Sequence, residues 1–250
     1  MNKLDKYKKS SKNKSEDNIW SSISDLMSGL MIVFLFISIS FMAKVNKETN
    51  NAIQTSATVK EIVNTYNNRN KAIYDDLVVA FQDYANKWNM NIDQTDGTIR
   101  FEEPDVLFGE GESKITPKFQ EILNQFFPLY IETIYKNHKD SIKEIRIEGH
   151  TSSSWRAEVD ELTSFFKNME LSQTRTRNVL NYVMNIPESK PYEEWLRKNM
   201  TANGLSSSRL ILDENGNEDA QRSRRVEFRI VTDSEDVIRQ ILEKGFKGED

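Results

Sequence analysis

The chain has 250 residues, of which 29% are charged, and its formal net charge at neutral pH is −5. This length accommodates one membrane segment, a linker and one ordinary domain. The mildly acidic balance argues against nucleic acid as the main partner, since nucleic-acid binding favours a basic patch. Because the chain contains no cysteine, disulfides, thiolate metal sites and cysteine nucleophiles are excluded.

Residues 19–43 form an apolar run with a single charged side chain, Asp25. A helix of this length spans roughly 37 Å, more than the ~30 Å hydrocarbon core of a bilayer. The run is too long for the apolar part of a secretory signal peptide, and no clear small-residue cleavage site follows Ala43. We therefore predict one uncleaved transmembrane helix at 19–43.

Residues 1–18 form a basic tail that contains six lysines and three acidic residues. Only Lys44 and Lys47 follow closely after the apolar run. Since cytoplasmic flanks carry the excess of positive charge, the N-terminus is expected in the cytoplasm. The sequence thus predicts a single-pass inner-membrane protein whose C-terminal domain lies in the periplasm.

Asp25 is the strongest candidate for a functional residue in the membrane segment. A carboxylate inside the membrane costs on the order of 3 kcal/mol on insertion scales, and such residues usually mark an ion or proton path. Ser24 and Ser28 are candidates to support that path, although serines in membrane helices more often bond their own backbone. The alternative is that Asp25 is a solvated residue at the headgroup boundary, because it lies near the cytoplasmic end.

Residues 44–90 contain neither proline nor glycine, which favours a long helix. Apolar residues recur at helical spacing over 59–66 and again over 73–88. We interpret this region as a helical linker that pairs with a second copy as a dimeric coiled coil. For residues 44–58 a solvated spacer is an equal alternative, and a plug that closes an ion path is a further one.

Residues 91–232 have the pattern of an α/β domain, an α+β sandwich with helices against one face of a sheet. Thr116 and Pro117 have the residue types of a helix N-cap and first helical position. The expected elements are a strand at 97–102, a helix from 117 in which Pro128 allows a break, a strand at 142–148, a helix at 171–184, a short helix at 191–200 and a strand at 225–231. Residues 233–250 are a C-terminal tail.

Four motifs in this domain resemble those of OmpA-like peptidoglycan-binding domains, in the same order. They are V-L-F-G at 106–109, I-E-G-H-T at 147–151, N-M-E-L-S-Q-T-R at 168–175 and S-R-R-V-E-F at 223–228. In the last motif serine stands where the family has asparagine.

This resemblance implies a groove for the peptide stem of the cell wall. It implies that Arg175 binds the free carboxylate of a diamino acid, a role that suits the forked guanidinium group. It also implies that Thr151, Asn168 and Leu171 form the groove and that Arg225 reaches it from the neighbouring strand. The alternative for each arginine, Arg224 included, is an internal ion pair.

The sequence departs from the family directly after the G-H-T motif. Ser152 stands where the family usually has an aspartate that binds the amine of the diamino acid. Since a hydroxyl group cannot replace a carboxylate charge, the ligand differs, binding is weaker, or another acid takes the position. We favour an acid of the following loop, Glu158, Asp160 or Glu161.

The N-terminal segment has a resemblance of its own. Its basic tail followed by W-S-S-I-S-D-L-M at 20–27 is similar to the membrane entry of MotB-type stator subunits, in which the aspartate carries the ion. Together the two resemblances describe the B subunit of a MotB/ZorB-type motor. The terminal S-R-R-V-E motif and the longer domain are more similar to the ZorB group of Zorya anti-phage systems than to flagellar MotB.

This family implies a non-enzymatic protein that works as a dimer within a ring of A subunits, conducts protons or sodium through Asp25 and grips peptidoglycan. A flagellar stator subunit and a passive membrane-tethered wall-binding protein are the alternatives. No nucleotide-binding motif or metal-spaced residue set is present, so no cofactor or metal is expected. His138 and His150 are interpreted as structural, and the acidic run at 213–219 as a solvated loop.

Overall fold

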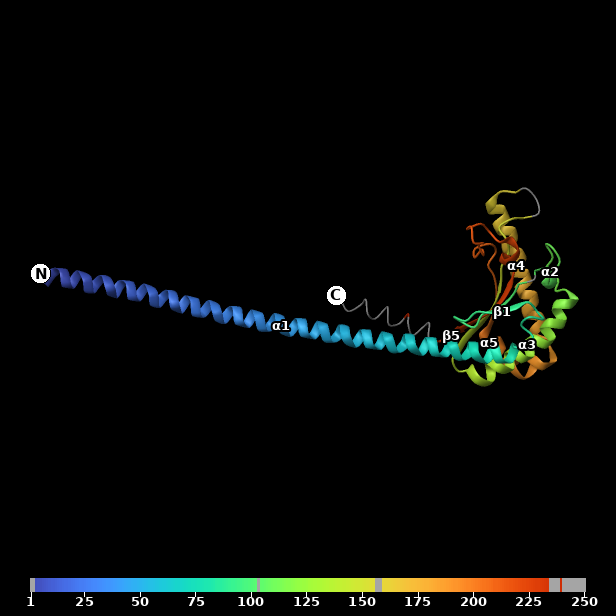
Figure 1. The fold of residues 1–250 in the computed structure, drawn as a ribbon, viewed down its shortest axis with the longest axis horizontal. Coiled ribbons are helices and arrows are strands. Elements are labelled where there is room, and N and C mark those ends of the chain that lie inside the picture. The colour runs from blue at the N-terminus through green and yellow to red at the C-terminus, as the bar shows by residue number, and fades with distance from the viewer. Residues whose placement is uncertain (1–2, 103, 156–158, 234–238, 240–250) are drawn as a thin grey trace. The chain divides into compact units, whose positions relative to one another are not determined.

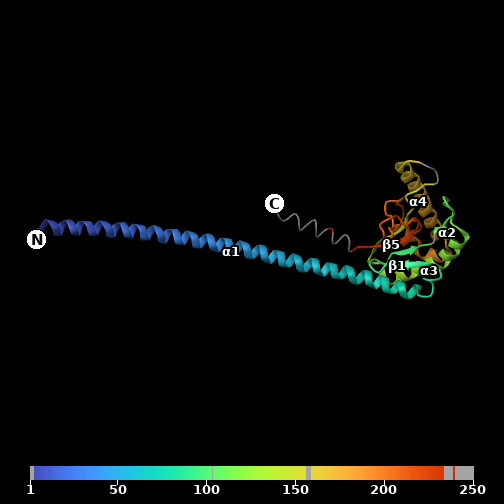
Figure 2. The ribbon, with the colours of Figure 1, turned by 45° about the horizontal axis from the view of Figure 1, so that its top comes forward.

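The computed structural model describes residues 3–102, 104–155, 159–233 and 239. The chain divides into two compact units, Met1–Thr58 and Val59–Asp250. The first unit is helical, and the second contains a mixed sheet with helices (Figures 1 and 2). The predicted combination of a long apolar N-terminal helix and an α/β domain is therefore confirmed.

The first helix, α1 (Lys3–Phe81), contains one glycine, Gly29, and no proline. Among the described residues, Ile19–Phe81 is the one stretch of helix long and apolar enough to cross a membrane. The large apolar side chains from Ile19 to Met42 are exposed in the single chain. An all-round apolar surface of this kind is typical of a helix that lipid or other helices cover.

The last turns of α1 belong to the core of the second unit. Ile73, Leu77 and Phe81 follow one another at four-residue spacing, and all three are fully buried. All three lie within the helical linker predicted at 44–90. Because this apolar face is covered within the chain, it is not available to a coiled coil, whereas Val59 and Val63 remain exposed.

The sheet has five strands in the order β1-β2-β5-β3-β4. The strands are β1 (Met90–Ile92), β2 (Ile99–Phe101), β3 (Ile142–Gly149), β4 (Met200–Gly204) and β5 (Val226–Thr232). Strands β3 and β4 are parallel, and the other neighbours are antiparallel. The central pair, β3 and β5, brings Gly149 opposite Val226, so the G-H-T motif and the two arginines at 224 and 225 meet at one end of the sheet.

Six further helical segments complete the described part of the domain. They are α2 (Pro104–Leu107), α3 (Pro117–His138), α4 (Glu161–Met184), the 3-10 helix η1 (Pro187–Tyr192), α5 (Glu193–Asn199) and α6 (Ala220–Ser223). Thr116 caps α3 as predicted, because its hydroxyl oxygen accepts a hydrogen bond from Phe119 N at 3.1 Å. Helix α3 continues through Pro128, where the sequence allowed a break.

Helix α4 begins ten residues earlier than the predicted start at 171. Its N-cap is Asp160, and its buried face is a row of small polar side chains that becomes apolar only near the end. The row consists of Ser164, Asn168, Ser172, Thr176, Val179 and Val183. Periodicity of apolar residues cannot reveal such a helix.

Two glycines let α4 approach the sheet closely. A Cβ atom at Gly149 would lie 2.6 Å from Cγ2 of Thr176, and one at Gly204 would lie 2.2 Å from the backbone nitrogen of Gln173. The two glycines on the strands and the small residues on α4 therefore act together, because both are needed for the helix and the sheet to pack this closely.

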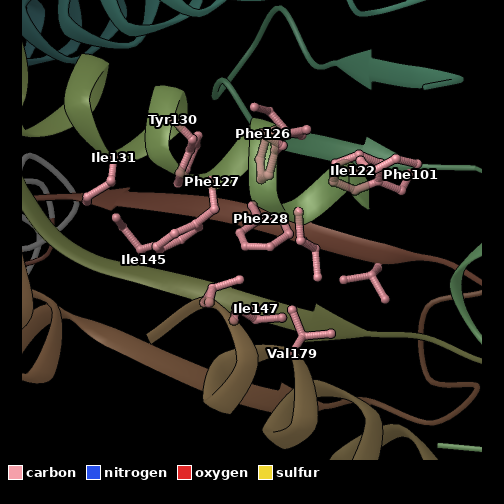
Figure 3. Packing of buried hydrophobic residues seen from close by; sticks show 14 of the residues in the cluster. Phe101, Ile122, Phe126, Phe127, Tyr130, Ile131, Ile145, Ile147, Val179 and Phe228 are labelled. Atoms are coloured by element: carbon pink, nitrogen blue, oxygen red, sulfur yellow. The ribbon is translucent and has the colours of Figure 1, made fainter. Parts of the chain in front are cut away.

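The core lies between the sheet and the helices (Figure 3). Phe126 and Tyr130 of α3 point toward Phe228 of β5, with ring centroids 5.0 and 5.7 Å from the Phe228 ring. Ile147 of β3 lies beside Val179 of α4 in the same layer. This aromatic and aliphatic packing fixes the ends of β3 and β5, where the candidate groove is.

Candidate functional site: a membrane acid and a wall-facing groove

The membrane segment and the groove belong to different units of the chain, and each is described by itself. In the first unit, Asp25 makes no hydrogen bond or ion pair with another described residue. The Ser28 hydroxyl donates to the Ser24 backbone oxygen at 2.8 Å. Ser28 thus bonds its own helix in the single chain, the alternative recognised from the sequence, and Asp25 remains a lone acid in an apolar stretch.

In the second unit, a cavity of about 220 Å³ lies where the ends of β3 and β5 meet α4. One wall comes from the loop after β3 and from α4, and the other comes from α2 and the turn that follows it. The lining residues are Asp105, Phe108, Gly109, Glu110, Gly111, Thr151, Ser152, Ser154, Trp155, Asn168, Leu171, Arg175 and Arg224. The structure therefore brings together four of the five predicted groove residues: Thr151, Asn168, Leu171 and Arg175.

Arg175 is fixed by the turn on the opposite wall. Its Nε donates to the Glu112 backbone oxygen at 2.8 Å, and another guanidinium nitrogen donates to the Gly109 backbone oxygen at 3.2 Å. The guanidinium carbon lies 4.8 Å from the centre of the Phe108 ring. These contacts orient Arg175 without neutralising it, because its partners are carbonyl groups and an aromatic face.

The positive charge of Arg175 lacks a carboxylate partner among the residues that the structure describes. Burial of the guanidinium, together with the positive charge of Arg224, lowers the pKa of Arg175 to about 10. Both effects disfavour the charged form, and a bound anion would relieve both. The positive charges of Arg175 and Arg224 on this side of the cavity therefore suit a negatively charged ligand.

Asn168 shapes the groove from behind. Its side-chain nitrogen donates to the backbone oxygens of Ser152 at 3.1 Å and Ser154 at 3.2 Å. The loop is also held by Glu218, whose carboxylate accepts from Ser153 N at 2.9 Å and from the Ser153 hydroxyl. The acidic run at 213–219, expected to be a solvated loop, therefore contributes a clamp on the loop of the groove.

Arg224 and Arg225, which directly precede β5, have different surroundings. Arg225 is buried, and its Nε donates to Oε1 of Glu227 at 2.7 Å. Arg224 lines the cavity, and its Nε is buried with no hydrogen-bond partner in the described chain. The structure thus puts Arg225, the residue chosen from the sequence, in the internal ion pair, and it puts Arg224 in the groove.

Behind the groove, three buried acceptor groups gather: Glu148, His150 and Glu227. Nε2 of His150 lies 3.9 Å from Oε2 of Glu148 and 3.6 Å from Oε2 of Glu227, both longer than a hydrogen bond. Burial alone would raise the pKa of Glu227, but His150 and Arg225 outweigh burial and hold that pKa below its usual range.

Guanidinium groups already supply the counter-charge of this cluster. Arg209 contacts Glu148 at 3.0 Å, and Arg100 shares Oε1 of Glu227 with Arg225 at 2.7 Å. A divalent cation would lie beside three positive charges, which opposes metal binding. The cluster is therefore an ion network that joins β2, β3 and β5. The His150 backbone N–H donates to Arg225 O at 3.0 Å, which continues the pairing of β3 and β5 beyond Gly149 and Val226.

The acids proposed to replace the missing aspartate lie elsewhere. Asp160 is the N-cap of α4, where hydrogen bonds from Thr163 hold the pKa of the Asp160 carboxyl below its usual value. Neither Asp160 nor Glu161 lines the cavity. Glu158 lies outside the described residues.

Two acids that sequence analysis passed over, Asp105 and Glu110, line the cavity instead. Asp105 lies in the first turn of α2, a helix that was not among the elements expected from the sequence. The residue was not recognised because a four-residue helix has no periodic pattern. Its position three residues before Phe108 of the V-L-F-G motif is the only signal the sequence offers.

Comparisons with known proteins gave a family match within the domain and one relative over most of the chain. The OmpA family matches residues 107–227, which include the whole groove except Asp105. The chain is 42% identical to the Zorya protein ZorB of Escherichia coli, over 92% of this chain and 95% of that protein.

Two similar solved structures come from MotB-like proteins. A putative MotB-like protein from Desulfovibrio vulgaris is 22% identical with a TM-score of 0.47, covering 69% of this chain and 94% of its own. The periplasmic domain of Helicobacter pylori MotB is 17% identical with a TM-score of 0.42, covering 63% of this chain and 90% of its own.

Proposed function

Because the chain belongs to the family of the Zorya protein ZorB, we propose that it is the B subunit of an ion-driven inner-membrane motor that acts in anti-phage defence. In this proposal it is a non-enzymatic, single-pass protein with a cytoplasmic N-terminus and a periplasmic domain. Two copies lie within a ring of A subunits, and each copy grips peptidoglycan.

The observation that carries the proposal is the lone acid Asp25 in an exposed apolar helix. A carboxyl group in a low-dielectric surrounding favours its neutral form, so it readily takes up a cation and releases it where water returns. Moving one charge through the membrane potential yields about 2.3 kcal/mol per 100 mV. Each uptake and release also changes the charge that this helix presents to its neighbours, which biases their packing.

A motor of this kind needs a fixed point, and the groove supplies one. The charged guanidinium groups of Arg175 and Arg224 suit the free carboxylate of a peptide stem in the cell wall. Asn168 and Glu218 hold the loop on which this groove is built. The role predicted for Arg225 thus passes to Arg224, while Arg225 supports the groove through Glu227.

The experiment is to compare Asp25→Asn with the wild type in cells that carry the A subunit and the other components of the system. We expect normal assembly and normal wall binding, with complete loss of protection against phage. Glu48→Gln is the matched control, because it makes the same acid-to-amide change on α1 at an exposed position paired with Lys44. Full protection with Asp25→Asn would refute the motor proposal and leave a passive wall anchor.

A further inference from the structure

The groove has the charges of a ligand that is both an anion and a cation. We propose that Asp105 binds the ammonium group of this ligand and replaces the aspartate that the family has at the position of Ser152. The ligand class is an amino-acid end with a free ammonium and a free carboxylate on one carbon atom. This inference rests on the proposed wall binding and names the residue that gives it specificity.

In this proposal the carboxylate of the ligand faces Arg175 and Arg224. Arg175 and Arg224 are close enough for the charge of Arg224 to disfavour that of Arg175. Neither has a carboxylate partner among the described side chains. Two like charges held together without a counter-ion are costly unless an anion joins them.

Two of the residues that line the cavity, Thr151 and Arg224, carry a buried polar atom without a hydrogen-bond partner among the described residues. Thr151 lines the cavity and is 3% exposed, yet its Oγ1 has no hydrogen-bond partner within the described structure. Nε of Arg224 is buried and unpartnered in the same way. Since buried polar groups are normally satisfied, these two lining residues keep unused hydrogen-bonding capacity beside the cavity, as expected of a site for a polar ligand.

Asp105 is the acid best placed to meet the cationic half. It lines the same 220 Å³ cavity from α2, its side chain is exposed, and it makes no hydrogen bond or ion pair with another described residue. Glu110, the other acid of the cavity, already interacts with another group. Asp160 and Glu218 are occupied at the N-cap of α4 and at Ser153.

The position of Asp105 also explains why Ser152 is tolerated. Ser152 is nearly buried, and its backbone oxygen accepts from Asn168, so its part of the loop serves the frame of the groove. The carboxylate has moved to the facing wall, whereas the arginine has kept its position on α4. The ligand would bridge the two walls, with its carboxylate toward Arg175 and Arg224 and its ammonium toward Asp105.

The test uses the full-length protein in detergent and purified cell-wall sacculi, with two soluble competitors. Diaminopimelic acid carries ammonium and carboxylate on each end, whereas pimelic acid keeps both carboxylates and lacks the amines. For the wild type, we expect diaminopimelic acid to displace sacculi and pimelic acid to be at least ~10-fold weaker. Asp105→Asn should bind sacculi at least ~10-fold more weakly and should lose the preference between the competitors.

Asp160→Asn is the control, since asparagine also caps helices and the residue does not line the cavity. It should behave like the wild type in both measurements. Arg175→Ala distinguishes the proposed binding of the cell wall from the proposed role of Asp105. If Arg175→Ala loses sacculus binding while Asp105→Asn keeps both binding and preference, wall binding stands and the role of Asp105 is refuted. If the wild type does not bind sacculi, wall binding and the role of Asp105 fall together.

Discussion

The membrane segment and the domain handle their polar groups in opposite ways. In residues 19–43 one carboxylate stands among exposed apolar side chains, and no described residue of the chain makes a hydrogen bond or ion pair with it. In the domain, Glu227 is enclosed by Arg100, Arg225 and His150. The buried network around Glu227 is therefore satisfied by the domain's own chain, while the membrane segment depends on other molecules for surroundings that suit Asp25.

The largest effect on folding is expected from breaking the enclosed network with Glu227→Gln. Removing one partner of a buried ion pair leaves the other charge uncompensated and costs about 3 kcal/mol or more. The measurement is urea unfolding of the full-length protein in detergent at neutral pH. Glu194→Gln, which removes a fully exposed acid, is the control and should unfold like the wild type.

The wild type and Glu227→Gln should also differ in how their free energy of unfolding depends on pH. The pKa of Glu227 is lowered in the folded state, so its stabilisation is present above the ordinary glutamate pKa and is lost as pH falls toward the folded value. The wild type should therefore lose stability below about pH 4.3, and Glu227→Gln should lose less over that range. Parallel curves for the two proteins would contradict the ion network.

A smaller effect on stability is expected from Gly204→Ala. The added Cβ would overlap the backbone of Gln173 in α4, and overpacking of this kind costs about 1–3 kcal/mol.

Gly29→Ala is the counterpart in the membrane segment, where nothing lies within 4 Å of the added atom. It should leave helix content and domain unfolding unchanged, so any loss of protection against phage would locate a partner helix at Gly29.

In the groove, Arg175→Ala should weaken sacculus binding by roughly 10- to 100-fold, since a hydrogen bond to a charged group contributes about 1.5–3 kcal/mol. Arg175→Lys keeps the charge but loses the fork, and it should restore only part of the binding. Arg177→Ala on the exposed face of α4 is the control. Equal binding by Arg175→Ala and Arg177→Ala would contradict the groove.

Much of this arrangement was predictable from the sequence, because its signals are strong and local. The apolar run with Asp25 predicted the long apolar helix, and the strand patterns and motifs of the domain predicted three of the five described strands and four groove residues. The early start of α4 was not predictable from apolar periodicity, since its buried face is made of Ser164, Asn168 and similar residues. The choice between Arg224 and Arg225 depended on which way each side chain points, and that is decided by packing around Glu227.

Asp105 illustrates a second limit of sequence reasoning. The missing acid at Ser152 was sought in the following loop, close in sequence, where Asp160 turned out to cap α4. The facing wall comes from α2, more than forty residues earlier. Only the fold brings α2 and the loop after β3 to the same cavity.

The most direct test of the central claim is ion flux through the membrane segment. Wild-type protein and the proposed A subunit are reconstituted in vesicles, a membrane potential is imposed, and internal pH and internal sodium are each followed with a dye. The proposal predicts ion uptake by the wild type and by Glu48→Gln, and background uptake by Asp25→Asn with the complex intact. Equal uptake by Asp25→Asn and the wild type would contradict the assignment of Asp25 as the ion carrier.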